Sequence, residues 1–206
     1  DCFLNRYAEF VGVQYENVLA TNGSDMAIRY LCEVFAPEGG KVVTVSPTFE
    51  MYRVNCAILG LNHVAVSYED DLSIDTDKIV NAIDTDTDIV VLLNPNNPVG
   101  TAYTKDEAKR IIKKAQQMNA IVIIDEAYHY FYDQTFLPYI SHFDNVVILR
   151  TFSKLFSMAA CRLGVIISNP QIIEYVKKSH LTFDVNSIAL KFGERILEHK
   201  DLIEQL

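Results

Sequence analysis

Short apolar runs alternate along the chain with longer stretches of helical periodicity. Most of the runs are apolar at every position, which is typical of parallel strands whose two faces are both covered by helices. The runs that we interpret as strands are residues 18–20, 41–45, 63–66, 89–93, 120–124, 146–149 and 165–167. The stretches expected to be helical are residues 25–35, 50–59, 75–83, 105–118 and 188–206.

This alternation predicts an α/β fold with a mostly parallel, seven-stranded sheet. No internal repeat or Pro/Gly-rich linker interrupts it, so residues 1–206 are expected to form one domain. The chain begins with Asp1 instead of Met, and its last helical pattern runs to the final residue. We therefore interpret it as a fragment of a longer protein.

Composition narrows the class of protein. Half of the 206 residues are hydrophobic and 22% are charged, as in ordinary globular proteins. The net charge of -9 argues against nucleic-acid binding, which needs a basic face. The apolar runs reach about five residues, far below the ~20 of a membrane helix, so no membrane association is expected. Four scattered cysteines without C-x-x-C spacing indicate neither a disulfide framework nor a zinc site, and a cytoplasmic location is expected.

Four polar motifs directly follow expected strands. They are TNGSD at residues 21–25, NPNNP at 94–98, DEAY at 125–128 and RTFSK at 150–154. In a parallel α/β sheet, ligands bind beyond the carboxyl ends of the strands. We therefore expect the four motifs to meet at one rim of the sheet and to form the site.

Two of these motifs contain groups suited to an anion. Ser24 and Asp25 open a helix, whose N-terminus favours negative charge, although the same residues are equally consistent with an ordinary helix cap. The glycine motifs of P-loops and dinucleotide-binding folds are absent. Lys154 has apolar neighbours and Arg162 lies eight positions on, a setting that lowers the pKa of a lysine and makes it nucleophilic. A Ser-Lys pair after a strand is, taken alone, more often simply solvated.

The other two motifs are also open to two interpretations. Asp125 should lie at the buried end of a central strand, where a carboxylate needs a cation or a metal. It is alternatively a helix cap, with Tyr128 a core residue. A metal site formed with Glu126, His129 and His142 has no supporting ligand spacing, so no metal is expected. Residues 94–98 form either a plain turn or a loop that points an Asn amide at a ligand.

The order and spacing of three motifs together resemble a known family. These are Asn-Pro-Asn-Asn-Pro-x-Gly at 94–100, Asp-Glu-Ala-Tyr-x-x-Phe at 125–131 and Ser-Lys-x-Phe…Arg-x-Gly at 153–164. They resemble the fold-type I pyridoxal-phosphate enzymes of aminotransferase class I/II, most closely the histidinol-phosphate aminotransferases. The resemblance covers essentially all of residues 1–206, which would be the large, cofactor-binding domain with a three-layer αβα fold. An N-terminal segment and most of the C-terminal small domain would lie outside this chain.

The resemblance implies a role for each matching residue. Lys154 would carry pyridoxal 5'-phosphate as a Schiff base and would then move the proton at the substrate Cα. Asp125 would pair with the pyridinium nitrogen, Asn97 and Tyr128 would hydrogen-bond the ring oxygen, and Phe49 would stack on the ring. The phosphate would be held by Ser24, Asp25, Thr151, Ser153 and Arg162. The chain departs from the family at Phe49, often Tyr, and at residues 158–162, where a glycine beside Arg162 is replaced and a tight turn could differ.

The implied activity is amino-group transfer from an amino acid or amino alcohol phosphate to a 2-oxo acid. L-histidinol phosphate and 2-oxoglutarate are the specific expectation, in a homodimer. The alternatives are a pyridoxal-phosphate decarboxylase acting on a phosphorylated amino acid and a non-catalytic, cofactor-binding sensor domain. The family's substrate-gripping arginines lie in the regions outside this chain, so the sequence does not identify the substrate.

Overall fold

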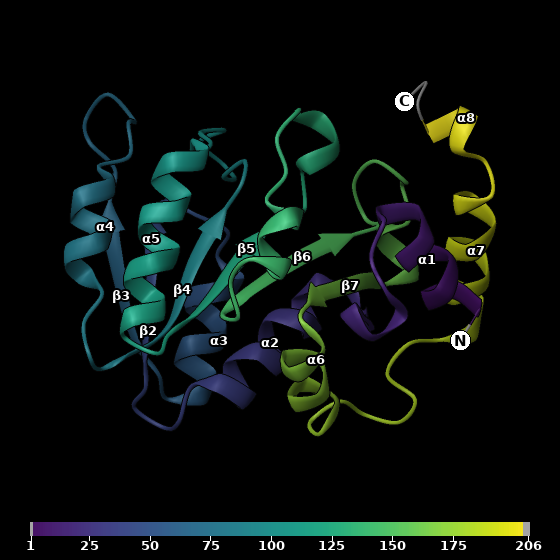
Figure 1. Cartoon of the computed structure of the whole chain (residues 1–206), viewed down its shortest axis with the longest axis horizontal. Coiled ribbons are helices and arrows are strands. Elements are labelled where there is room, and N and C mark those ends of the chain that lie inside the picture. The colour runs from purple at the N-terminus through teal and green to yellow at the C-terminus, as the bar shows by residue number, and fades with distance from the viewer. Residues whose placement is uncertain (1, 204–206) are drawn as a thin grey trace.

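A seven-stranded sheet lies between two layers of helices (Figure 1). The computed structural model describes residues 2–203, except for the side chains of Lys200 and Leu202. The strands are β1 (Val18–Asn22), β2 (Lys41–Ser46), β3 (Asn62–Ser67), β4 (Thr87–Leu93), β5 (Ile121–Asp125), β6 (Val146–Thr151) and β7 (Leu163–Ser168). All seven predicted strands are present, and the three-layer α/β prediction is confirmed.

The sheet has the order β1-β7-β6-β5-β4-β2-β3, and β7 alone runs antiparallel to its neighbours. Because of this reversal, β7 begins at the edge of the sheet where β1 and β6 end. Leu163 pairs with Asn22, and Gly164 pairs with both Thr21 and Thr151. The residue just before β7, Arg162, is therefore at the same rim as the carboxyl ends of the parallel strands.

Side chains alternate along the strands, so that successive residues point into two separate hydrophobic cores. In β5, for example, Val122 and Ile124 face one core and Ile123 faces the other. The first core is covered by α1 (Cys2–Val11), α4 (Thr76–Ala82), α5 (Lys105–Gln117) and α7 (Ser187–Leu197). The second is covered by α2 (Gly23–Phe35), α3 (Met51–Leu59) and α6 (Pro170–Lys177). Two buried faces explain why the strands are apolar at every position.

Local signals set most helix boundaries. The helices predicted at 25–35, 50–59, 75–83 and 105–118 correspond to α2 to α5 within two residues. At the start of α5, the Thr104 hydroxyl accepts from the Glu107 N–H and the Glu107 carboxylate accepts from the Thr104 N–H, a capping box. Helices α1 and α6 were not predicted. For α6 a signal exists, since Asn169 caps the helix and Pro170 is its first residue.

The prediction of one continuous helix over 188–206 was wrong. Helix α7 ends at Leu197, a short α8 follows at Lys200–Ile203, and residues 204–206 lie outside the described part of the chain. The amides of Glu198 and His199 donate to carbonyls three residues back, at 3.1 and 3.0 Å. The last turn is thereby tightened and the α-helix ends.

The longest described helices, α2 and α5, have 13 residues each. Within residues 2–203, no helix combines the length and the apolar character needed to cross a membrane.

Candidate active site

A cavity of about 640 Å³, including its open mouth, lies at the rim where the polar motifs meet. All ten residues that the sequence analysis selected line it: Ser24, Asp25, Phe49, Asn97, Asp125, Tyr128, Thr151, Ser153, Lys154 and Arg162. Leu93, Ala127 and Ala159 also line the cavity and were not predicted. The expected convergence of the four motifs is therefore present.

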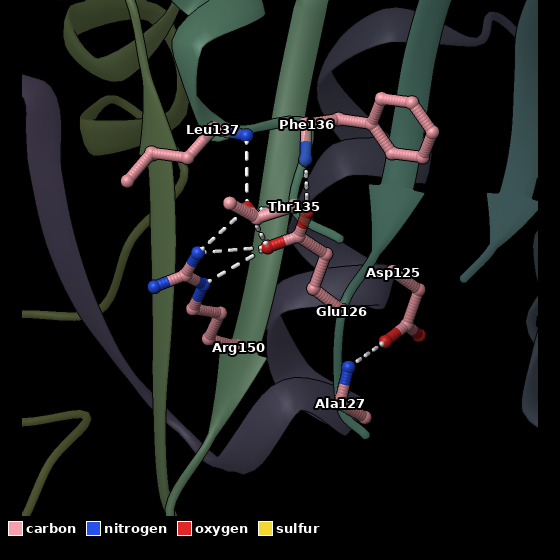
Figure 2. A network of polar contacts seen from close by, with 7 residues as sticks. All are labelled: Asp125, Glu126, Ala127, Thr135, Phe136, Leu137 and Arg150. Atoms are coloured by element: carbon pink, nitrogen blue, oxygen red, sulfur yellow. Dashed lines mark hydrogen bonds and ion pairs between the residues drawn. The ribbon is translucent and has the colours of Figure 1, made fainter. Parts of the chain in front are cut away.

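The Asp125 carboxylate, at the end of β5, is only 3% exposed. Its Oδ2 accepts a 2.7 Å hydrogen bond from the Tyr52 hydroxyl on α3. Its Oδ1 accepts one of 3.0 Å from the Ala127 N–H (Figure 2). Burial raises the pKa of Asp125 from 3.8 to about 6, against the lowering effect of these hydrogen bonds. None of the ion pairs within residues 2–203 involves Asp125. The carboxylate thus has neutral donors but no cation.

Lys154 and Tyr128 lie together in the cavity wall. The Lys154 Nζ is 5.1 Å from the centroid of the Tyr128 ring, within cation–π range. Lys154 follows a turn at the end of β6, in which the Ser153 N–H donates to the Thr151 hydroxyl at 3.1 Å. The amine is therefore held on a short turn directly after a central strand.

The loops that carry Phe49 and Asn97 are tied to each other by a neighbouring side chain. The Asn96 amide nitrogen donates to the Pro47 carbonyl at 2.9 Å, and its oxygen accepts from the Thr48 hydroxyl at 2.7 Å. Asn96 is 3% exposed. This bridge fixes the loop after β2 relative to the loop after β4.

The opposite end of the cavity is suited to an anion. Arg162 lies over the start of α2, where its Nη2 donates to the Asp25 carboxylate at 2.6 Å. The side chain of Asn22, the residue before α2, makes no capping hydrogen bond, so it does not occupy the first amides of the helix. A cation beside a helix N-terminus is an arrangement that binds phosphate.

Two glycines make this arrangement sterically possible. Gly23 has a φ of +76°, and a Cβ there would lie 2.5 Å from the Arg162 Nη2. A Cβ on Gly164 would lie 2.5 Å from the Ser24 backbone nitrogen. Arg162 itself has a φ of 56°, in the left-handed region, at the turn where the family glycine is replaced. Arg162 nevertheless reaches the cavity wall.

Comparison with known proteins identifies the family. A profile described as Aminotransferase class I and II matches residues 1–205. The chain belongs to this family. A histidinol-phosphate aminotransferase from Clostridium novyi is 36% identical over 200 residues, which cover 97% of this chain and 55% of that protein. One from Pyrococcus furiosus is 34% identical over 198 residues, 96% of this chain and 56% of that protein. The chain thus spans about half the length of these relatives.

Solved structures of aminotransferases share the fold. The histidinol-phosphate aminotransferase from Clostridium acetobutylicum has a TM-score of 0.90 at 24% identity, covering 99% of this chain and 61% of that one. The histidinol-phosphate aminotransferase from Sinorhizobium meliloti, solved in complex with pyridoxal-5'-phosphate, has a TM-score of 0.88 at 25% identity. That match covers 98% of this chain and 56% of the other.

A buried ion pair joins Arg150 to Glu126, the residue that follows Asp125 (Figure 2). The Arg150 Nη2 and Nε donate to the Glu126 Oε2 at 2.9 and 3.1 Å, and the side chains are 6% and 0% exposed. Glu126 also accepts from the Phe136 N–H at 2.6 Å and the Thr135 hydroxyl at 2.8 Å. The pair therefore joins β5, β6 and the loop after β5.

Sequence reasoning considered Glu126 only as a metal ligand and gave Arg150 no role. The useful signal was the arginine directly after the apolar run of β6, since a buried arginine needs an acid. With Glu126 bound to Arg150, the alternative metal set loses a ligand. Within residues 2–203, no three His, Cys, Asp or Glu side chains are grouped so as to hold a metal ion.

Breaking the buried pair should destabilise this protein strongly. Glu126→Gln leaves the Arg150 charge buried without its partner, and we expect a loss of about 3–5 kcal/mol in the free energy of unfolding. The matched control is Glu174→Gln, which breaks the exposed Lys177–Glu174 pair and should change stability little. Urea unfolding of the full chain at pH 7 measures both. Equal losses for the two variants would contradict the role given to the buried pair.

Asp125 should make the stability of the cofactor-free protein depend on pH. Because its pKa is raised in the folded state, its favourable contribution is fully present below about pH 4 and is lost as pH rises through about 6. The full loss is about 3 kcal/mol at ~1.4 kcal/mol per pH unit. Asp125→Asn removes the ionisation, so the variant should be more stable than wild type at pH 8, with the difference vanishing near pH 4. Thermal unfolding at the two pH values tests this, and a variant destabilised equally at both would refute it.

Proposed function

We propose that the full chain, meaning the longer protein of which residues 1–206 are a part, is a pyridoxal-phosphate-dependent aminotransferase. It would move an amino group from L-histidinol phosphate to 2-oxoglutarate. Family membership and the names of the two relatives described above support this proposal. The observation that carries it is a single cavity holding a lysine amine, a buried carboxylate without a cation, and an arginine at a helix start. Residues 1–206 would then be the cofactor-binding domain, and we further propose a cytoplasmic homodimer.

The ring end of the cavity fits a pyridinium cation. Asp125 is desolvated and has only neutral hydrogen-bond donors, so a cation beside it would remove the cost of keeping it ionised. Phe49 offers a ring face for stacking, and Asn97 and Tyr128 offer donors for a ring oxygen. When bound, pyridoxal phosphate draws electrons from the bonds at the substrate Cα, provided that its ring nitrogen is protonated.

The other end of the cavity fits a phosphate, because Arg162 lies beside the uncapped first amides of α2. Ser24, Thr151 and Ser153 add hydroxyl groups to the same wall. Arg162 supplies a guanidinium that can donate two hydrogen bonds to one phosphate. An anion there would compete with the Asp25 carboxylate for Arg162.

Lys154 is the proposed reactive group between these ends. Its Nζ would hold the cofactor covalently until the substrate amine replaces it, and would then carry the proton that leaves the substrate Cα. The Tyr128 ring restricts where the Nζ can lie. Asp125 would keep the ring nitrogen protonated throughout.

The first test is covalent labelling of the full chain with pyridoxal phosphate and sodium borohydride. We expect wild type and the control Lys177→Ala to be labelled and Lys154→Ala to remain unlabelled, because Lys154 is the lysine that lines the cavity among the described side chains. Adding L-histidinol phosphate before reduction should release the cofactor as pyridoxamine phosphate, and 2-oxoglutarate should reverse this. Undiminished labelling of Lys154→Ala would refute the assignment of Lys154. L-histidinol phosphate has no carboxyl group to lose, so a phosphorylated amino acid is added in a parallel sample, and release of CO2 from it would instead indicate a decarboxylase. Binding of the cofactor without reaction with any amino donor would indicate a sensor.

A glycine pair tests the phosphate end separately. Gly23 and Gly39 have φ of +76° and +78°, so alanine strains the backbone equally, but only at Gly23 does the new Cβ meet Arg162. We expect Gly23→Ala to weaken pyridoxal phosphate binding roughly tenfold and Gly39→Ala to leave it unchanged. Binding of pyridoxal, which lacks the phosphate, should be similar in both. Equal affinities of the two variants for pyridoxal phosphate would contradict the placement of the phosphate.

A further inference from the structure

Tyr52 is buried beside the cavity without lining it. It lies in the first turn of α3 and is fully buried, and its hydroxyl donates to the Asp125 Oδ2 at 2.7 Å. Nothing in the sequence distinguishes Tyr52, since an aromatic side chain on the inner face of an amphipathic helix is usually a core residue. Here its hydroxyl is directed at the buried carboxylate of Asp125, which lines the cavity.

Each oxygen of the Asp125 carboxylate accepts one hydrogen bond, and each bond comes from a different donor. Tyr52 donates to Oδ2 from α3, and the Ala127 N–H donates to Oδ1 from the turn after β5. One donor on each oxygen, from two different elements, fixes the plane of the carboxylate as well as its rotamer. Each oxygen keeps a lone pair that can accept from a cation in the cavity.

The Tyr52 phenol keeps its proton at working pH and donates it in a hydrogen bond to the Asp125 carboxylate. Burial and the neighbouring Asp125 charge raise the pKa of Tyr52 well above 10, so its proton stays in place. A hydrogen bond donated to a carboxylate favours the ionised form. The hydrogen bond from Tyr52 therefore lowers the pKa of Asp125, whereas burial raises it.

The neighbouring negative charges also favour the protonated form of Asp125, and the Tyr52 donor acts against them. Asp25 on α2 and Glu126 at the end of β5 both raise the pKa of Asp125, although Glu126 is already paired with Arg150. The nearby Cys32 is a neutral thiol whose pKa is raised to about 12 by burial. Among the groups lining the same cavity, Lys154 and Arg162 carry the positive charge, and Arg162 is bound to Asp25.

We propose that Tyr52 is a positioning residue of the aminotransferase site: its hydroxyl holds Asp125 ionised and oriented toward the cofactor ring nitrogen. This inference rests on the proposed function. Tyr52 itself touches Asp125 and not the cavity, so its effect on the cofactor is transmitted through that carboxylate.

The test compares two buried tyrosines on the full chain. Tyr52→Phe removes one hydroxyl and keeps the ring in the core. The matched control is Tyr30→Phe, because Tyr30 is also buried and its hydroxyl also donates to an aspartate, Asp184, at 3.0 Å, outside the cavity. The first readout is the ionisation midpoint of Asp125 in cofactor-free protein, followed by carbon-13 NMR of labelled aspartate and assigned with Asp125→Asn. The second is the affinity for pyridoxal phosphate between pH 5 and 9.

We expect Tyr52→Phe to raise the Asp125 midpoint by about one pH unit, the size of one hydrogen bond to a charged group. With the wild-type midpoint at about 6, the ionised fraction of Asp125, and with it the affinity for the cofactor, should fall about tenfold at pH 5 but only about twofold at pH 7. Affinity should fall at low pH as Asp125 becomes protonated, and this fall should begin at a higher pH in Tyr52→Phe than in wild type. Tyr30→Phe should leave both midpoints unchanged.

Unshifted midpoints in Tyr52→Phe, whatever its loss of stability, would overturn the proposal and leave Tyr52 a core residue. A wild-type chain that binds no pyridoxal phosphate would overturn the proposed function. The NMR titration, which needs no cofactor, would then still decide whether Tyr52 controls the ionisation of Asp125.

Discussion

Two consecutive carboxylates buried at the end of β5 are the constraint on which the site depends. Because side chains alternate along a strand, Asp125 and Glu126 point to opposite faces of the sheet (Figure 2). On one face Glu126 meets a cation of the chain, Arg150, and its charge is neutralised there. On the other face Asp125 meets only the neutral donors of Tyr52 and Ala127. One carboxylate is therefore neutralised within the fold, and the other has no cationic partner among residues 2–203.

The antiparallel strand β7 determines where the opposite charge lies. A parallel strand at this position would place its start, and Arg162 with it, at the far edge of the sheet. The reversal pairs Leu163 with Asn22 and thereby brings Arg162 onto the start of α2. This close approach requires glycine at positions 23 and 164, where a Cβ would meet Arg162 or the Ser24 backbone. The strand direction and the absence of side chains at Gly23 and Gly164 together allow Arg162 to lie at the start of α2.

The sequence was sufficient for the strands and for the cavity wall, for physical reasons. The seven apolar runs alternate with helical stretches and therefore predict strands of a mostly parallel sheet. Polar residues that follow such strands, for example Asp125 and Lys154, lie together at one rim of the sheet. The direction of β7 was not predictable from its run, because an apolar strand reads the same in both directions.

Contacts between residues far apart in the sequence were also not predictable. Tyr52 lies 73 positions from Asp125 and occupies an ordinary core position of α3, so nothing local distinguishes it. The Arg150–Glu126 pair had a local signal, an arginine next to an apolar run, but its partner is set by the register between β5 and β6. The end of α7 at Leu197 has no glycine or proline to mark it.

The charges of the cavity also fix the orientation of a ligand that carries charges of both signs. Asp25 and Arg162 already form a pair at the α2 end, so an anion entering there gains Arg162 and the helix amides while weakening one partly exposed ion pair, which is worth little. At the β5 end, a cation meets a carboxylate whose ionisation costs energy in its absence. The reversed ligand would place its anion beside buried Asp125 and its cation against Arg162, so that both ends are repelled. A molecule with a cationic ring and an anionic phosphate therefore has one favourable orientation in the cavity, set before any contact with Lys154 is made.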